Sequence, residues 1–273
     1  MVVRIAPSEA EYAARAFTSE TLERAAQCMR ADGALVLEDI VDTALVREAS
    51  LTFAERYARY LDDRPHGDAL LVGDKRLMIT IDFEPPFDSP EFFANSLLLP
   101  VLSVAMAEEF VLGGYGVVCS LPGSPMQHRH RDGGILFSLS GFDRLLPMTA
   151  VTVAMPLLEM NPIHGTTALW LGSHREPNET PVSGEGDAPV VREGSCVLWD
   201  YRLFHAGTAN RSTLPRPLLY LMYCRPWFLD HHNYHKQPPL RASRSWLTQL
   251  SSENQRLLER AKAGWVHWSR LEK

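Results

Sequence analysis

The second half of the chain is built from short segments of strand-forming residues, separated by clusters of Gly, Pro, Asn and Asp. These segments are 115–121, 134–139, 149–158, 166–171, 195–199 and 218–224. Many short strands with turn residues between them are typical of a β-sandwich or barrel. We therefore predict that this part of the chain folds as a jelly roll.

The first part of the chain has a mainly helical pattern. Thr18 or Ser19 can cap a helix that runs to about Arg30, before a short strand at 34–38. Apolar residues at helical spacing predict a second helix at about 42–61. A third helical stretch is expected from Ser89-Pro90, since Pro favours the first helical position.

The whole chain is short enough to form one domain. We expect three parts in residues 1–273: a helical part at about 1–110, a jelly-roll core at about 111–230 and a C-terminal helix at about 246–262. The predicted fold class is therefore mainly β with added helices, in a cupin-like jelly roll.

Composition and charge exclude several classes of protein. The net charge is −6, from 27 basic and 33 acidic residues, so we expect no nucleic-acid partner. The longest near-apolar stretch, Leu97–Met106, is half of the ~20 residues that span a bilayer, and we predict no membrane segment. The N-terminus lacks the apolar region of a secretion signal. Four scattered cysteines without a CxxC pair indicate free thiols, so we expect a cytoplasmic protein of unknown oligomeric state.

The most informative polar segment is 126–134, Met-Gln-His-Arg-His-Arg-Asp-Gly-Gly. If this segment is extended, its side chains alternate between two faces. His128, His130 and Asp132 then share one face, and the other face carries Gln127, Arg129 and Arg131. Two imidazoles and a carboxylate are costly to bury without a partner, and a divalent cation is a suitable partner. The alternative is a polar surface turn in which neighbouring arginines neutralise Asp132.

A second polar pair follows in the last third of the chain. Residues 194–207 predict a strand and turn that end at His205, and eleven residues later Arg216 opens the next strand. Two His and one carboxylate suit Fe(II), with positions left for an oxygen-donor co-substrate and O₂. The planar guanidinium suits a carboxylate such as 2-oxoglutarate carries. The alternatives are a core or surface histidine and a surface ion pair.

Taken together, these motifs resemble the phytanoyl-CoA dioxygenase superfamily of Fe(II)/2-oxoglutarate oxygenases, especially its branch acting on fungal meroterpenoids and indole alkaloids. The matching elements are Gln127-x-x-His130-Arg-Asp132, Gly165–Arg175, His205-Ala-Gly-x-x-Asn210 and Arg216, over roughly residues 115–230. The resemblance implies a double-stranded β-helix with helical additions.

The resemblance also implies a set of ligands. The implied iron ligands are His130, Asp132 and His205. The implied 2-oxoglutarate contacts are Arg216 on the far carboxylate and hydrogen bonds from Gln127 and Thr167. The family often has a hydroxyl residue two positions after the distal His, whereas this chain has Gly207, which removes one possible co-substrate contact.

Two related classes of protein, cupins and halogenating oxygenases, are less consistent with the motif. His128-x-His130 also opens the metal motif of cupins, but cupins usually add a Glu that residues 131–140 lack, so we favour His130 and Asp132 as ligands. Relatives that halogenate resemble this pattern but lack the carboxylate. With Asp132 present, we do not expect halogenation.

We therefore predict a dioxygenase that uses Fe(II), 2-oxoglutarate and O₂ to hydroxylate a C–H bond of a small molecule, with release of succinate and CO₂. The apolar residues at 78–81 favour a hydrophobic, natural-product-like substrate. The alternatives are a non-oxidative cupin-like isomerase and a metal-free jelly roll that binds a small ligand. Tyr220 and Tyr223 point to opposite faces of one strand, so at most one can reach the substrate. The His-rich segment 231–235 is expected to be a solvated loop, with lining of the cavity mouth as the alternative.

Overall fold

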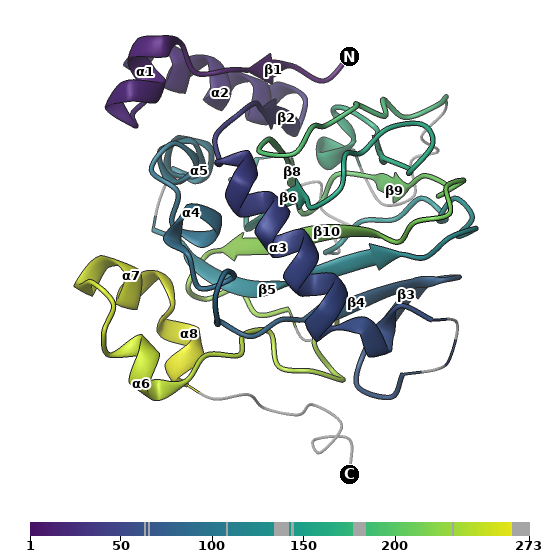
Figure 1. Cartoon of the computed structure of the whole chain (residues 1–273). Helices are drawn as coiled ribbons and strands as arrows, with labels where there is room; N and C mark the ends of the chain where they lie inside the picture. Colours follow the sequence, from purple (N-terminus) through teal and green to yellow (C-terminus); the bar gives the residue numbers. More distant parts are fainter. Residues whose placement is uncertain are drawn as a thin grey trace.

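A large sheet and a small sheet form the body of the protein (Figure 1). The computed structural model describes residues 1–62, 64, 66–107, 109–133, 142, 145–176, 184–230 and 232–263. The eight-stranded sheet has the order β1 (Arg4–Ile5), β2 (Ala34–Leu37), β8 (Cys196–Asp200), β6 (Ala150–Pro156), β10 (Arg216–Cys224), β5 (Val111–Ser120), β4 (Arg76–Thr80) and β3 (Leu70–Gly73). The small sheet pairs β7 (Thr167–Leu169) with β9 (His205–Gly207). Neighbouring strands are antiparallel, except that β1 and β2 are parallel.

The helices pack on one face of the large sheet (Figure 1). They are α1 (Glu9–Ala14), α2 (Ser19–Ala31), α3 (Thr43–Arg56), α4 (Pro90–Phe93), α5 (Leu98–Met106), α6 (Arg244–Leu247), α7 (Ser252–Leu257) and α8 (Glu259–Lys262). Among the described residues, no helix combines the length and apolar character needed to cross a bilayer. The predicted mainly β jelly roll with added helices is confirmed.

Side chains along β10 alternate between the helical core and the opposite face of the large sheet. Leu219, Leu221 and Tyr223 pack in the core that the helices share with the sheet, and the Tyr223 hydroxyl donates to the carbonyl of Phe93 at 2.8 Å. The intervening side chains, such as Tyr220, belong to the opposite face, toward the small sheet. Because the helices occupy one face, polar groups for chemistry can project from the other face.

Several expectations about secondary structure were wrong or fall outside the described residues. Instead of one helix at about 246–262, the chain forms the three short helices α6, α7 and α8. Ser243 caps the start of α6, and Ser251 caps a new helix, α7, within the expected range. The predicted strand at 134–139 lies outside the described residues. Strands β3 and β4 were not recognised in the sequence. Of the apolar residues at 78–81, Ile79 and Ile81 belong to the helical core and only Met78 faces the small sheet.

The four cysteines are free, as the sequence predicts. Cys119, Cys196 and Cys224 are buried, and Cys28 is half-buried. Burial raises the pKa of the Cys119 thiol to about 12, so this thiol is uncharged at neutral pH.

Candidate metal and co-substrate site

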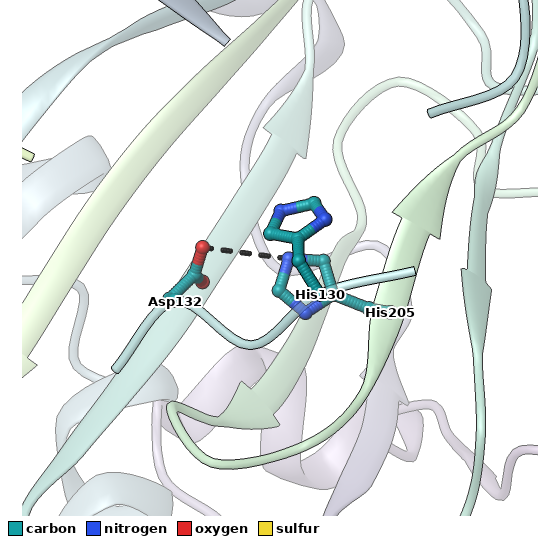
Figure 2. Close-up of side chains that lie close together, drawn as sticks. All are labelled: His130, Asp132 and His205. Carbon is teal, nitrogen blue, oxygen red and sulfur yellow. Dashed lines mark ion pairs between the residues drawn. The ribbon is translucent and has the colours of Figure 1, made fainter. Parts of the chain in front are cut away.

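Two segments far apart in the sequence bring His130, Asp132 and His205 together (Figure 2). The main chains of His130 and His205 exchange two N–H···O=C hydrogen bonds, of 3.0 and 2.9 Å. One ligand atom from each of the three side chains lies within 4.8 Å of the other two, and His205 Nε2 is 3.4 Å from Asp132 Oδ1. His128, the other metal candidate, is exposed and outside this cluster.

Both imidazoles of the cluster are oriented by their own backbone. Nδ1 of His130 lies 3.0 Å from the carbonyl oxygen of His128, and Nδ1 of His205 lies 3.0 Å from that of Leu203. Because a carbonyl only accepts, each Nδ1 carries a hydrogen, and in the neutral imidazole Nε2 then has the lone pair that can bind a metal. Metal-binding histidines are commonly oriented in this way.

The electrostatics of the cluster favour an ionised carboxylate. Burial raises the pKa of Asp132, but the charge and hydrogen bond of His205 and the charge of His130 outweigh it and hold the pKa well below its usual range. Burial lowers the pKa of His205, yet Asp132 outweighs this and raises it. Burial and the charge of His205 lower the pKa of His130. A buried anion beside two imidazole lone pairs is a donor set that fits a divalent cation.

A pair of buried guanidinium groups lies in the same cavity. Arg76 Nε and Arg216 Nη2 both donate to the hydroxyl of Ser120, at 2.7 and 2.9 Å. Nε and Nη1 of Arg216 are buried without a hydrogen-bond partner, and among the described residues no carboxylate forms an ion pair with either arginine. Burial lowers the pKa of each guanidinium to about 10, and the charge of Arg76 adds to this effect at Arg216. Both remain charged at neutral pH, so the pair fits an anionic ligand.

The remaining predicted residues also line this cavity. Gln127 accepts the backbone N–H of Gly207 at 2.7 Å through Oε1, and its amide nitrogen donates to the carbonyl of Val72. Thr167 projects from β7. A Cβ at Gly207 would lie 2.7 Å from Gln127 Oε1 and 3.1 Å from Arg76 Cζ. The space of a larger residue at position 207 is therefore occupied by Gln127 and Arg76.

The cavity has a volume of about 350 Å³. Its apolar lining comes from the strands, as Leu70, Val72, Met78, Val118 and Leu218, and its remaining polar lining includes His128, His232, Asn233 and His235. The solvated loop expected at 231–235 is only partly solvated in the part described, and it lines the cavity, which is the alternative that the sequence left open. His232 is exposed, but Tyr234 is buried, and the side chain of Asn233 donates to the carbonyl of Asp132 at 3.1 Å.

The expected alternation of side chains over 127–132 is also wrong. Gln127 and Arg131 line the same cavity as His130 and Asp132. The reason is that the segment is not a regular strand: its one bridge is at His130, so no continuous pleat imposes a period of two. Of the tyrosines on β10, Tyr220 reaches the cavity and Tyr223 does not, as predicted.

Arg76 is the main site residue that the sequence interpretation missed. It lies on β4, a strand that was not recognised, and no motif includes it. The sequence pattern Arg-Leu-Met-Ile-Thr at 76–80 could have indicated a strand. Alternation along such a strand places Arg76 on the same face as Met78 and opposite Leu77.

Comparisons with known proteins concern the family and the fold. The family model described as phytanoyl-CoA dioxygenase (PhyH) matches residues 29–218. The dioxygenase trt7 of Aspergillus terreus is 25% identical over 75% of this chain and 73% of its own length. Among solved structures, AviO1 from Streptomyces viridochromogenes has a TM-score of 0.60 and 17% identity over 78% of this chain and 99% of its own. SnoN, a non-haem α-ketoglutarate-dependent epimerase from nogalamycin biosynthesis, has a TM-score of 0.56 and 18% identity over 76% of this chain and 82% of its own.

Proposed function

The chain belongs to the phytanoyl-CoA dioxygenase (PhyH) family, and on this premise we propose that it is a non-haem Fe(II)- and 2-oxoglutarate-dependent dioxygenase. The observation that carries the proposal is the cluster of His130, Asp132 and His205 beside two buried arginines. Together, the two groups match the two ligands of one reaction: a divalent metal and an anionic co-substrate. The helices cover the sheet that bears the site, so we treat residues 1–273 as one catalytic domain.

In this proposal, three side chains hold the metal through Nε2 of His130, Nε2 of His205 and a carboxylate oxygen of Asp132. The hydrogens on the two Nδ1 atoms are already used by carbonyl groups, so neither imidazole changes its tautomer to bind. Two His and one carboxylate suit Fe(II) and leave positions for other ligands.

The residues assigned to 2-oxoglutarate are Arg216, Gln127 and Thr167, with Arg76 as an addition from the structure. Nε and Nη1 of Arg216, which lack partners, donate hydrogen bonds to the far carboxylate of 2-oxoglutarate. This contact is favourable because a buried cationic N–H without an acceptor costs free energy. Arg76 adds a second positive charge next to it, which compensates the double negative charge of the co-substrate. Gln127 lines the same cavity and is assigned a hydrogen bond to the co-substrate.

The bound iron and co-substrate supply the activation of O₂ for oxidation of a C–H bond, with release of succinate and CO₂. The contribution of the protein is to orient both ligands and to keep the substrate beside the metal. His205 is 5% exposed and the side chain of Asp132 is 12% exposed, so both ligands are largely shielded from bulk water.

We propose that the substrate is a small, mostly hydrophobic, natural-product-like molecule and that the reaction is a hydroxylation. The apolar wall formed by β3, β4, β5 and β10 supports this assignment, since it offers aliphatic contacts beside the metal cluster. The imidazoles of His128, His232 and His235 line the same cavity and provide hydrogen bonds for polar groups of the substrate.

The test is anaerobic addition of Fe(II) and 2-oxoglutarate to the purified protein, followed by O₂. We expect the weak visible charge-transfer band of the iron–2-oxoglutarate chelate, and succinate release once O₂ is admitted. Asp132→Ala and His205→Ala should remove both signals. His164→Ala is the matched control, because His164 also bonds a carbonyl through Nδ1 but lies in the turn at 161–165.

The opposite results would favour the alternatives. If Asp132→Ala released succinate as fast as the unsubstituted protein, the assigned site would be wrong. If the unsubstituted protein gave neither the band nor succinate, the protein would be a non-oxidative isomerase or a metal-free binder of small ligands.

A further inference from the structure

The two carboxylate oxygens of Asp132 have different surroundings. Oδ1 lies 3.4 Å from Nε2 of His205, inside the metal cluster. Oδ2 accepts hydrogen bonds from the hydroxyl of Thr152 at 2.9 Å, from Nε1 of Trp199 at 3.1 Å and from the hydroxyl of Tyr220 at 3.1 Å. One oxygen therefore faces the imidazoles, and the other is held by three neighbouring side chains.

These three donors come from adjacent strands of the large sheet. Thr152 lies on β6, Trp199 on β8 and Tyr220 on β10, and β6 is the central strand of the three. Thr152 and Trp199 are directly paired in the register between β6 and β8. Each donor is at most 6% exposed. The positions of the donors are thus set by the register of the sheet and not by a loop.

A count of hydrogen-bond donors shows that both lone pairs of Oδ2 are occupied, so none is left to bind a metal ion. The hydroxyls of Thr152 and Tyr220 are also 3.2 Å apart, so one of them can donate to the other instead of to the carboxylate. In either arrangement, Trp199 and at least one hydroxyl still donate to Oδ2. A carboxylate oxygen offers two lone pairs, and two donors occupy both.

We propose that Thr152 and Tyr220, together with Trp199, are positioning residues that restrict Asp132 to metal coordination through Oδ1 alone. This inference rests on the proposed function. A carboxylate that binds through both oxygens takes two coordination positions, one of which the chelating co-substrate needs. The three donors therefore keep a position open for 2-oxoglutarate.

The inference predicts different changes in the affinity for the metal and the affinity for 2-oxoglutarate, whereas a structural defect would lower both. Without the two hydroxyl donors, Trp199 occupies only one lone pair of Oδ2 and the other becomes available to the metal, so metal affinity is kept or increases. The co-substrate then competes with Oδ2 for its position, so the affinity for 2-oxoglutarate falls.

The experiment compares the unsubstituted protein with the double variant Thr152→Val/Tyr220→Phe, which removes both hydroxyls and keeps the side-chain shapes. Ni(II) is titrated first by calorimetry, and 2-oxoglutarate is then titrated into the Ni(II)-loaded protein. We expect Ni(II) affinity within about threefold of the unsubstituted value and 2-oxoglutarate affinity reduced by ~10-fold or more, the usual size of effects from groups that support a metal ligand.

Control variants distinguish a specific role from a general loss of folding. Tyr223→Phe removes a buried hydroxyl from the helical side of the same strand and should change neither affinity. Thr152→Ser keeps a hydroxyl at the same position and should keep 2-oxoglutarate affinity. Thr152→Ala/Tyr220→Phe, which removes the same two hydroxyls, tests the inference should the first double variant fail to fold.

Equal loss of both affinities, or no change in the affinity for 2-oxoglutarate, would overturn the inference. Absence of 2-oxoglutarate binding by the unsubstituted Ni(II) protein would instead overturn the proposed function on which it rests.

Discussion

Replacing Arg216 with Lys tests whether the guanidinium holds the co-substrate. The substitution keeps a positive charge at the end of β10 but removes the planar group whose Nε and Nη1 are buried without partners. Lys has one compact ammonium group and reaches less far, so it cannot replace the donors on both sides of the guanidinium. We therefore expect weaker binding of 2-oxoglutarate and unchanged binding of the metal.

The size of the effect follows from the number of hydrogen bonds lost. A hydrogen bond to a charged group contributes about 1.5–3 kcal/mol. The loss of one such bond weakens the binding of 2-oxoglutarate by ~10- to 150-fold, since each 1.4 kcal/mol changes the dissociation constant by about a factor of ten. Arg76 remains in place beside Ser120, so its charge still attracts the co-substrate and limits the loss.

The assay is an anaerobic titration of the Fe(II)-loaded protein with 2-oxoglutarate, followed through the visible band of the chelate. Arg225→Lys is the matched control, because Arg225 is a buried arginine at the other end of the same strand and donates to the carbonyls of Met148 and Met106. If Arg216→Lys bound 2-oxoglutarate as tightly as the unsubstituted protein, the role assigned to Arg216 would be refuted. The same conclusion would follow if Arg225→Lys weakened binding equally.

Two further predictions concern a glycine in the site and a carboxylate far from it. Gly207→Ala places a methyl group 2.7 Å from Gln127 Oε1 and 3.1 Å from Arg76 Cζ, so both side chains must move. We expect about tenfold weaker 2-oxoglutarate binding in the same titration, with a folded protein by circular dichroism; unchanged binding would show that neither side chain contacts the co-substrate. Glu11 accepts backbone N–H groups, chiefly that of Thr18, which lower its pKa from 4.5 to about 2. Its stabilising effect is therefore present above pH 4.5 and lost as the pH falls through about 2. Glu11→Gln should lower the melting temperature at pH 6 but not at pH 2, and an equal difference at both pH values would contradict this assignment.

The local motifs in the sequence, together with the family resemblance, pointed to the residues that the structure brings into one cluster. His130 and Asp132 are two positions apart, and a short spacing of this kind survives whether the segment is a strand or a loop. His205 and Arg216 were recognisable because each lies at the boundary between a turn and an apolar run. Their roles remain a proposal, but the structure places all four side chains on one cavity.

The orientation of side chains in irregular segments was not accessible from the sequence. Alternation predicted that Gln127 would face away from His130, yet both line the cavity, because no regular ladder holds this segment. The segment at 231–235 looked like a solvated loop because of its polar composition. Its contact with Asp132, through Asn233, depends on residues about a hundred positions away.

The amino-acid sequence by itself determined the alternating faces of the strands and the chemical groups available for a metal and a keto acid, because both depend on residue type and short spacing. Only the tertiary structure decided which of these groups meet. Arg76, Ser120 and Arg216 converge because β4, β5 and β10 are neighbours in one antiparallel register. The same register across β6, β8 and β10 places three donors on a single oxygen of Asp132. Strand order and register arise from packing of the whole chain, which local spacing does not encode.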